Sequence, residues 1–538
     1  MGMCVDRPAG AIAVSAPVGA MTGCPMDIES FLKHYSLIEN PFEAEEARHD
    51  PVFARSMDGG PRHPDFNKIL GQIDPPNTSI VFGEKGSGKT AIRLLIGQRI
   101  SAHNLANPDH QALLVAYDDL NPLLDRVMAR RRAGSSKWAD AEQLLDGFRL
   151  QDHQDAILSL AVTKLVDLLV SRGDDRGEAM AASPQIEQRF RKAPRRVRVD
   201  AAVLAALYDQ PRSGGGATRW RKLHARLRLR RITAATAAGY GGTAMMIVAI
   251  GLLIAQLVQK APPIPLTISL GITMAATVLL LGLSIAQHAR LWRLSRRIAH
   301  EMPAMDRAAA ALRRMLMDLS RSDLNRQDWP LPGADSRNSR YQLTSQLIEV
   351  LDLLGFAAMV VVVDRVDEPT IISGNAQRMR RVIWPLFDNK FLQQDRVAVK
   401  MLLPIELRHM LHRESDEFFQ EARLDKQHLI DPLTWSGATL YDLCSARLRA
   451  CCHRDEKQPI VLTDLFETDV TREMIIDALD QMHQPRDAFK FLYTLLQEHC
   501  RMVPQEQPRF KIPRLTVDTV RRAQSQRVQD LHRGLTPA

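Results

Sequence analysis

The chain has 538 residues, enough for three or four domains, and its 71 Lys and Arg against 62 Asp and Glu give a formal net charge of +9. The six cysteines are too few and too scattered for a disulfide framework. Residues 444 and 451–453 match no paired zinc-binding spacing, so we expect no metal site there. Residues 1–26 lack the basic region and apolar core of a signal peptide, and we expect them to be disordered.

The first segment with a recognisable chemistry is GEKGSGKT at residues 83–90, which fits the phosphate-binding P-loop pattern G-x-x-x-x-G-K-[ST]. An apolar run at 79–82 predicts a strand before it, and the run at 91–96 predicts a helix after it. In this context the loop's backbone N–H groups point at phosphate oxygens, and the helix N-terminus adds partial positive charge. A glycine-rich turn that fits the pattern by chance is the alternative.

We therefore expect ATP and Mg²⁺ as cofactors, held by the loop residues Gly83, Glu84, Lys85, Gly86, Ser87, Gly88, Lys89 and Thr90. Lys89 is expected to reach the β- and γ-phosphates and to assist catalysis there. The Thr90 hydroxyl is expected to ligate Mg²⁺.

A buried strand far downstream supplies the carboxylates that such a site needs. The apolar run at 357–363 contains four consecutive valines, typical of a central parallel strand buried on both faces. Asp364 follows at the carboxyl end, where open α/β sheets bind ligands, and is expected to organise Mg²⁺. Glu368, with Asp367 as the runner-up, is expected to orient or deprotonate the attacking water. A strand that merely ends in an acidic turn is the alternative.

The two site segments lie about 280 positions apart, too far for one uninterrupted nucleotide-binding core. One further strand is predicted between them, at 112–117, so residues from about 120 to about 345 are predicted to form an insertion. Within it, residues 232–258 and 264–287 carry no charge. Each exceeds the roughly 20 apolar residues that a membrane-spanning helix needs. We predict a transmembrane hairpin at 231–288 in contact with membrane lipid; a hairpin buried in a soluble protein is the alternative.

The charges beside these segments predict their orientation. Arginines crowd both flanks, at 219–231 and 290–297, whereas the connector has only Lys260. The positive-inside rule then gives a two-pass protein of the inner (cytoplasmic) membrane, with both termini and the nucleotide-binding domain cytoplasmic. Trp220 and Trp292 are expected at the membrane interface. The arginine runs could instead bind nucleic acid, but headgroup contact accounts for them without it.

The remaining segments predict further helices and one more core strand. A strand is expected at 396–403, and helices at 341–354, 377–392, 440–452 and 472–481. Arg486, in a Pro-Arg-Asp turn that opens a helix, is expected to sense the γ-phosphate from a C-terminal lid. The alternative is a plain Pro-initiated helix with Asp487 in its first turn.

The predicted fold is α/β: a P-loop NTPase with a parallel sheet, an inserted two-helix transmembrane hairpin and a C-terminal α-helical lid. The expected parts are a first NTPase half at 27–120, a helical and basic insertion at 121–230, the hairpin at 231–288, a helical return segment at 289–345, a second NTPase half at 346–435, and the lid and C-terminal region at 436–538.

With the loop at 83–90, the block at 360–368 and the hairpin between them, the chain resembles the KAP P-loop NTPases, within the STAND/AAA+ class. In that family two or four membrane helices interrupt the nucleotide-binding domain. Its members often carry two adjacent aspartates where this chain has Asp364-Arg365. The resemblance implies a role in signalling or in defence against phage and plasmids.

Two functions from different classes follow. The first is a membrane-anchored ATPase that acts as a nucleotide-dependent switch. The second is a nucleotide-gated membrane scaffold or effector that assembles on ATP binding with little turnover. Either would act as a homo-oligomer with a protein partner that the sequence does not identify.

Overall fold

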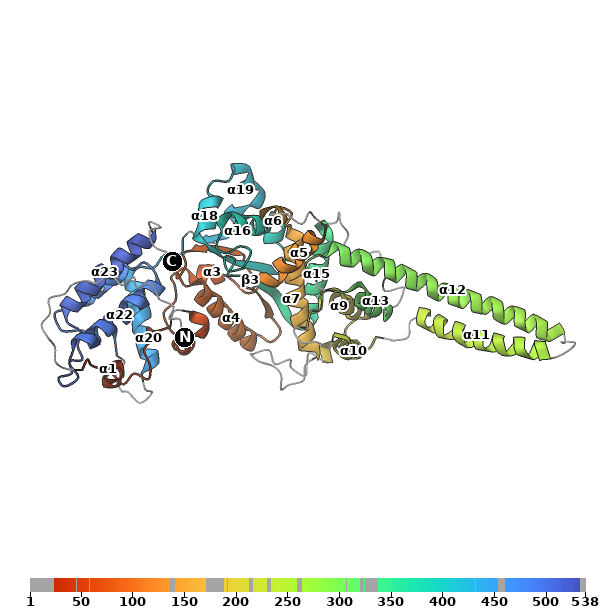
Figure 1. The fold of residues 1–538 in the computed structure, drawn as a ribbon, viewed down its shortest axis with the longest axis horizontal. Helices are drawn as coiled ribbons and strands as arrows, with labels where there is room; N and C mark the ends of the chain where they lie inside the picture. The colour runs from red at the N-terminus through yellow and green to blue at the C-terminus, as the bar shows by residue number, and fades with distance from the viewer. Residues whose placement is uncertain are drawn as a thin grey trace, which may run out of the picture. The chain divides into compact units, whose positions relative to one another are not determined.

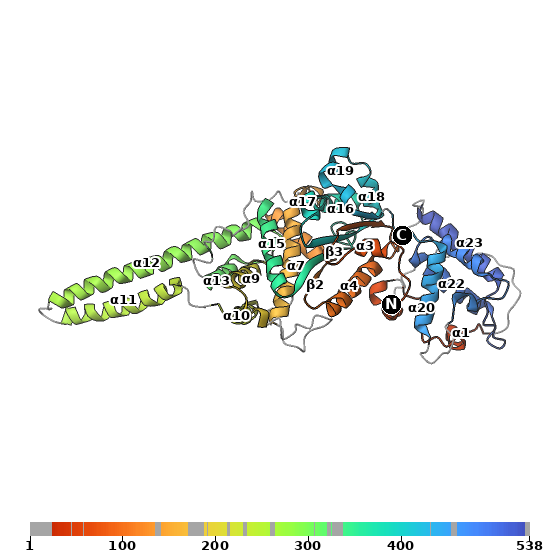
Figure 2. The ribbon, with the colours of Figure 1, turned by 180° about the vertical axis from the view of Figure 1, so that it is seen from behind.

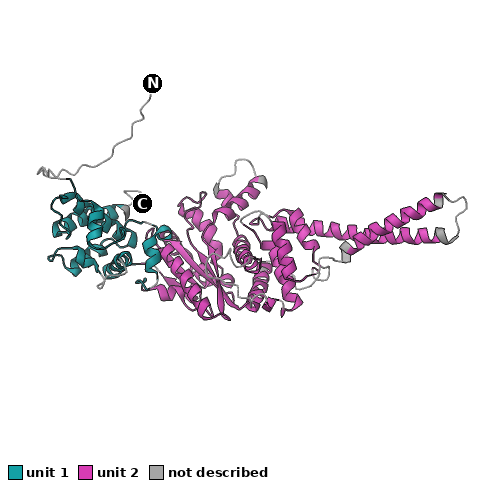
Figure 3. Ribbon diagram, turned by 90° about the horizontal axis from the view of Figure 1, so that it is seen from below, with its two compact units in different colours: residues 1–63, 434–538 teal, residues 64–433 magenta. Residues whose placement is uncertain are grey.

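The computed structural model describes residues 24–532, except for 45, 58, 135–140, 171–187, 191, 212–215, 230–233, 259–263, 306, 320–323, 325–336, 431 and 453–459. Residues 1–63 and 434–538 form one unit, which we call unit 1, and residues 64–433 form unit 2 (Figure 3). The described start of the predicted segment 27–120 thus groups with the C-terminal helices. Of the predicted disordered segment 1–26, residues 1–23 lie outside the described residues, whereas Met26 is 4% exposed and its N–H donates to the Val503 carbonyl at 2.8 Å.

Unit 2 is built on a parallel sheet. Its described strands have the order β2-β3-β4-β1-β5, in which every neighbouring pair is parallel. Their bounds are β1 (Ser79–Gly83), β2 (Gln111–Tyr117), β3 (Phe356–Val363), β4 (Val397–Pro404) and β5 (His428–Ile430). The predicted α/β class with a parallel sheet is confirmed. The valines of β3 are buried because neighbouring strands and helices cover both its edges and its faces.

Helices from the insertion cover one part of this sheet. Helices α7 (Leu150–Val170) and α15 (Arg337–Leu353) lie side by side in Figures 1 and 2, and they contact β2 and β3 respectively. Other helices of unit 2 are α3 (Phe66–Leu70), α4 (Lys89–Ala106), α5 (Asn121–Gly134), α6 (Ala141–Leu145), α9 (Arg195–Tyr208), α10 (Gly216–Arg226), α13 (Ala309–Met317), α18 (Ile405–Leu411) and α19 (Asp416–Ala422).

The single helix predicted at 377–392 is wrong. The segment forms α16 (Ala376–Ile383), a 3₁₀ turn η3 (Trp384–Leu386) and the short α17 (Asn389–Leu392). Pro385 explains the break, because it has no N–H to donate and its ring clashes with the preceding turn.

Two long apolar helices, α11 (Ala234–Val258) and α12 (Ile264–Glu301), pair side by side (Figures 1 and 2). Each contains a segment long and apolar enough to cross a membrane, and only 11% of each 18-residue apolar window is buried. A core helix of a soluble protein would be mostly buried. A Cβ at Gly242 would lie 2.9 Å from the Leu281 side chain, so a larger residue there would force that side chain to shift.

The residues flanking this pair differ in their surroundings. Trp292 is exposed, and the Arg296 guanidinium lies 3.9 Å from its ring centroid. Trp220, in contrast, is 6% exposed and its Nε1 donates to Asp318 Oδ2 at 2.7 Å. The expectation that Trp220 marks the membrane interface is therefore wrong, because its indole packs inside the helical insertion instead.

Unit 1 has its own helical core. Its elements are α1 (Ile28–His34), α2 (Pro51–Ser56), α20 (Gly437–Cys451), α21 (Arg472–Asp480), α22 (Pro485–Met502) and α23 (Arg514–His532). Arg447 of α20 forms a buried 2.5 Å ion pair with Asp50, which also caps α2 through the N–H groups of Val52 and Phe53. This pair ties the N-terminal segment to the C-terminal helices.

We expect unit 2 to lose stability below neutral pH through His153. Its Nε2–H donates to the Val382 carbonyl at 2.7 Å, and its Nδ1 accepts from the Tyr117 hydroxyl at 2.8 Å. Burial lowers the pKa of His153 to about 4 from 6.5. Between these values the unfolded chain binds a proton that the folded chain does not. The neutral, buried His153 therefore contributes fully to the free energy of unfolding above pH 6.5, and the contribution falls as the pH drops toward 4. At pH 5 the loss is about 2 kcal/mol.

Thermal unfolding at pH 7 and at pH 5 checks this expectation. The difference between the two pH values should be smaller in His153→Gln than in the unaltered protein, since glutamine does not titrate. An equal difference in both proteins would contradict the role of His153.

Candidate functional site

The loop at residues 83–90 joins the end of β1 to the start of α4. Gly86 and Gly88 have φ angles of 98° and 94°, in the left-handed region that favours glycine. A Cβ at Gly83 would lie 2.5 Å from Ser87 Oγ, which itself donates to the Glu84 carbonyl at 2.8 Å. The three glycines are therefore needed for the loop to close on itself.

Lys89, the first residue of α4, folds back over this loop. Its Nζ donates to the carbonyl oxygens of Gly83, at 2.7 Å, and Glu84, at 2.8 Å. Burial lowers the pKa of Lys89, while nearby carboxylates oppose that shift, in decreasing order those of Asp367, Asp364, Glu406 and Glu84. Among the described residues, the hydrogen-bond acceptors of the ammonium are thus these two carbonyls, and the carboxylates act on it through their charge.

Asp364 meets α4 at the carboxyl end of the sheet. Thr90 Oγ1 donates to its Oδ2 at 3.3 Å, although the two residues are 274 positions apart in the chain. Burial raises the pKa of Asp364, and Arg93, whose Nε lies 3.3 Å from the same Oδ2, lowers it. The predicted residues Lys89, Thr90 and Asp364 are therefore close together in the structure.

Arg93 and Asp118 were not among the predicted site residues. Arg93 follows Thr90 by one turn of α4, and its NH1 forms a 2.6 Å ion pair with Asp118 Oδ2 directly after β2. The available signal was the position of Asp118 at the carboxyl end of a strand, the edge at which Asp364 also lies. Arg93 thus bridges two carboxylates from neighbouring strands.

The two predicted water-activating carboxylates lie in the loop after Asp364. Glu368 Oε1 accepts from Arg365 Nε at 2.6 Å, and its side chain is half exposed. Arg365 has a φ of 60°, an uncommon value for a residue with a side chain. Asp367 has the largest carboxylate effect on the pKa of Lys89, so its charge acts on the site more directly.

Arg486 lies in the first turn of α22, in unit 1. It belongs to a different unit from Lys89 and Asp364, which are in unit 2.

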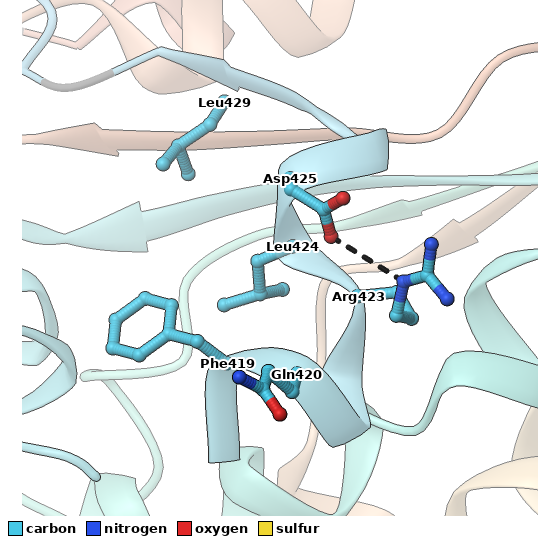
Figure 4. Close-up of a pocket in the computed structure, with 6 residues that line it drawn as sticks. All are labelled: Phe419, Gln420, Arg423, Leu424, Asp425 and Leu429. Carbon is cyan, nitrogen blue, oxygen red and sulfur yellow. Dashed lines mark ion pairs between the residues drawn. The ribbon is translucent and has the colours of Figure 1, made fainter. Parts of the chain in front are cut away.

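A depression of about 780 Å³ lies elsewhere in unit 2, at the edge strand β5 (Figure 4). Its lining comes from α19, the turn after it and β5, and comprises Phe419, Gln420, Arg423, Leu424, Asp425 and Leu429. None of the predicted site residues lines it.

The oxygens of Thr90 and Asp364 suit Mg²⁺ that is bound together with substrate phosphates, and they do not suit a metal ion held by protein ligands alone. No group of three or more His, Cys, Asp or Glu side chains in the described part of the chain is arranged to hold a metal ion. Mg²⁺ is usually bound by one or two carboxylates together with substrate phosphates, and the adjacent Thr90 hydroxyl and Asp364 carboxylate offer such a pair. These residues are the ones that would hold it.

The fold and site define a mixed α/β protein with a parallel sheet, a glycine-rich loop beside a buried aspartate, and two helices that could span a membrane. Comparisons of the chain with protein-family models, with curated proteins and with solved structures gave no match.

Proposed function

We propose that this chain is a membrane-anchored P-loop ATPase that acts as a nucleotide-dependent switch in signalling or defence. The observation that carries the proposal is the 3.3 Å approach of Thr90 Oγ1 to Asp364 Oδ2. A glycine-rich loop between a strand and a helix, beside an aspartate that ends a neighbouring strand, is the arrangement used to bind nucleotide phosphates and Mg²⁺.

The strand order supports the same location. From β1 the chain passes across β4 and β3 to the far edge strand β2, whereas β5 lies on the other side of β1. Open α/β sheets bind ligands outside the carboxyl ends of their strands, where the connections diverge in this way. The loop at 83–90 begins at the carboxyl end of β1, next to this point.

The site residues divide the binding of phosphate, Mg²⁺ and water among them. The loop N–H groups and the N-terminus of α4 hold phosphate oxygens. Lys89 exchanges the carbonyls of Gly83 and Glu84 for the β- and γ-phosphates. Thr90 and Asp364 would hold Mg²⁺, whose charge would stabilise the negative charge on the phosphates. Asp367 or Glu368 positions the attacking water.

We further propose that α11 and α12 form a two-pass hairpin of the inner membrane, with both termini and the sheet in the cytoplasm. The exposed Arg290, Arg293, Arg296 and Arg297 beside the exposed Trp292 support a cytoplasmic end for α12.

Thiol labelling in intact cells tests this orientation. Pro262→Cys should react with a membrane-impermeant reagent and Ser213→Cys should not, because the arginine excess keeps both flanks inside. The native Cys24, which is exposed, is an internal control that should react only after lysis. Labelling of position 213 but not 262 would contradict the orientation.

One observation favours the second function, a nucleotide-gated scaffold or effector with little turnover. Glu368 is engaged by Arg365, so a carboxylate expected to activate water is already paired. Such a protein would assemble as a homo-oligomer on ATP binding and act on the membrane or on a protein partner. Mass determination of the detergent-solubilised protein with and without ATP, alongside its hydrolysis rate, separates the two functions.

A further inference from the structure

The cytoplasmic end of the long helix α12 is held by an arginine from a neighbouring helix. The last carbonyls of a helix have no intrahelical donors, and a cation there also interacts favourably with the helix dipole. Arg130 NH1 of α5 donates to the carbonyl of Ala299 at 2.5 Å and to that of Met302 at 3.2 Å. Arg126, one turn earlier on α5, donates to the Ala304 carbonyl at 3.3 Å.

A third arginine reaches the same end from α15. Arg340 NH2 donates to the Glu301 carbonyl at 3.2 Å and is buried in an ion pair with Asp155 of α7. Helix α15 leads directly into β3, the strand that ends before Asp364. The end of α12 is therefore fixed to elements that continue into β2 and β3.

The other end of α5 is attached to the candidate site. Asp118, three residues before α5, is paired with Arg93, and Arg93 contacts Asp364. Asn121, the first residue of α5, accepts through Oδ1 from the Thr370 N–H at 3.1 Å, in the loop that follows Asp364. One helix of 14 residues thus contacts the site at its start and α12 at its end.

Helix α12 is continuous over 38 residues, from its apolar segment to Glu301. A helix whose backbone hydrogen bonds are unbroken moves as a rigid rod, so a displacement of one end also displaces the other. At the site, Mg²⁺ between Thr90 and Asp364 would compete with Arg93 for the same Oδ2. A change in the contacts of Arg93 reaches α5 through Asp118.

We propose that α5 couples nucleotide binding at Lys89 and Asp364 to the position of α12 in the membrane. Arg130 makes the contact through which α5 acts on α12. This inference rests on the proposed nucleotide-binding function. Coupling between two sites is reciprocal, so the state of the hairpin changes ATP affinity by the same factor by which ATP changes the hairpin.

The test uses the full chain in lipid nanodiscs, with Ala289→Cys in α12 carrying a polarity-sensitive fluorophore. Cys4 and the exposed Cys24 are replaced by serine. Position 289 is exposed. ATP with Mg²⁺ should change the emission, and Arg130→Gln should reduce that change by about fivefold or more. Arg131→Gln is the matched control, since Arg131 donates to the carbonyls of Leu144 and Gly147 rather than to α12. It should respond like the unaltered chain.

Asn121→Ala breaks the contact at the other end of α5 without touching α12, and it should blunt the emission change as well. If Arg130→Gln does not fold, Asn121→Ala alone tests the coupling. ATP binding is measured separately by calorimetry on each variant. Binding without any emission change, or an unaltered response in both Arg130→Gln and Asn121→Ala, overturns the coupling alone. Absence of ATP binding to the unaltered chain overturns the proposed function itself.

Discussion

Replacing Lys89 by alanine should abolish ATP binding, with a loss of affinity of about a hundredfold or more. The Lys89 ammonium lies against the backbone carbonyls of the loop, and charge-assisted bonds to phosphate in a buried site are strong. Backbone N–H groups of the loop and the α4 N-terminus supply only partial charges in its place. Calorimetric titration of the detergent-solubilised protein with ATP and Mg²⁺ measures the loss.

The matched control for this prediction is Lys85→Ala. Lys85 belongs to the same loop, but its side chain is exposed, so its contribution is expected through the backbone. This variant should bind ATP within about threefold of the unaltered protein, because surface charges contribute little. Equal ATP affinity in Lys89→Ala and in the unaltered chain would refute the assignment of the loop.

Glu368→Gln should keep ATP binding and lose hydrolysis, with a rate reduced by about a hundredfold or more. A carboxylate that only positions or deprotonates water is not needed to hold the nucleotide. Asp364→Asn should in addition weaken Mg²⁺-dependent binding, because it removes the charge beside Thr90. The measurements are steady-state phosphate release and ATP affinity with and without Mg²⁺.

Asp367→Asn decides between the two candidate carboxylates. Asp367 has the larger effect on the pKa of Lys89, and Glu368 is paired with Arg365. Either carboxylate can therefore be tested as the one that activates water. Hydrolysis that survives Glu368→Gln but fails in Asp367→Asn would assign the water to Asp367. If neither change slows turnover, this loop does not activate water.

The variant trapped with ATP also separates the two proposed functions. A switch that works by turnover should stop when hydrolysis is lost. A nucleotide-gated effector should stay assembled, or become more active, when ATP cannot be hydrolysed.

Much of the sheet could be predicted because its strands are runs of apolar and β-branched residues. The strand β5 was missed, since it has only three residues and contains His428. The burial of Trp220 could not be predicted either, because it depends on Asp318, which lies 98 positions away, directly after helix α13.

The closeness of Lys89, Thr90 and Asp364 could be expected, since the carboxyl ends of parallel strands share one edge of a sheet. The ion pair between Arg93 and Asp118 could not be predicted, because no sequence pattern requires a cation at that position of a helix. It exists only when β2 and α4 lie side by side in the fold.

ATP binding to the purified, detergent-solubilised full chain, titrated with and without Mg²⁺, tests the central claim most directly. We predict saturable binding that strengthens with Mg²⁺ in the unaltered chain and that loses this Mg²⁺ dependence in Asp364→Asn. Failure of the folded protein to bind ATP at millimolar concentration, or binding that Asp364→Asn leaves unchanged, would contradict it.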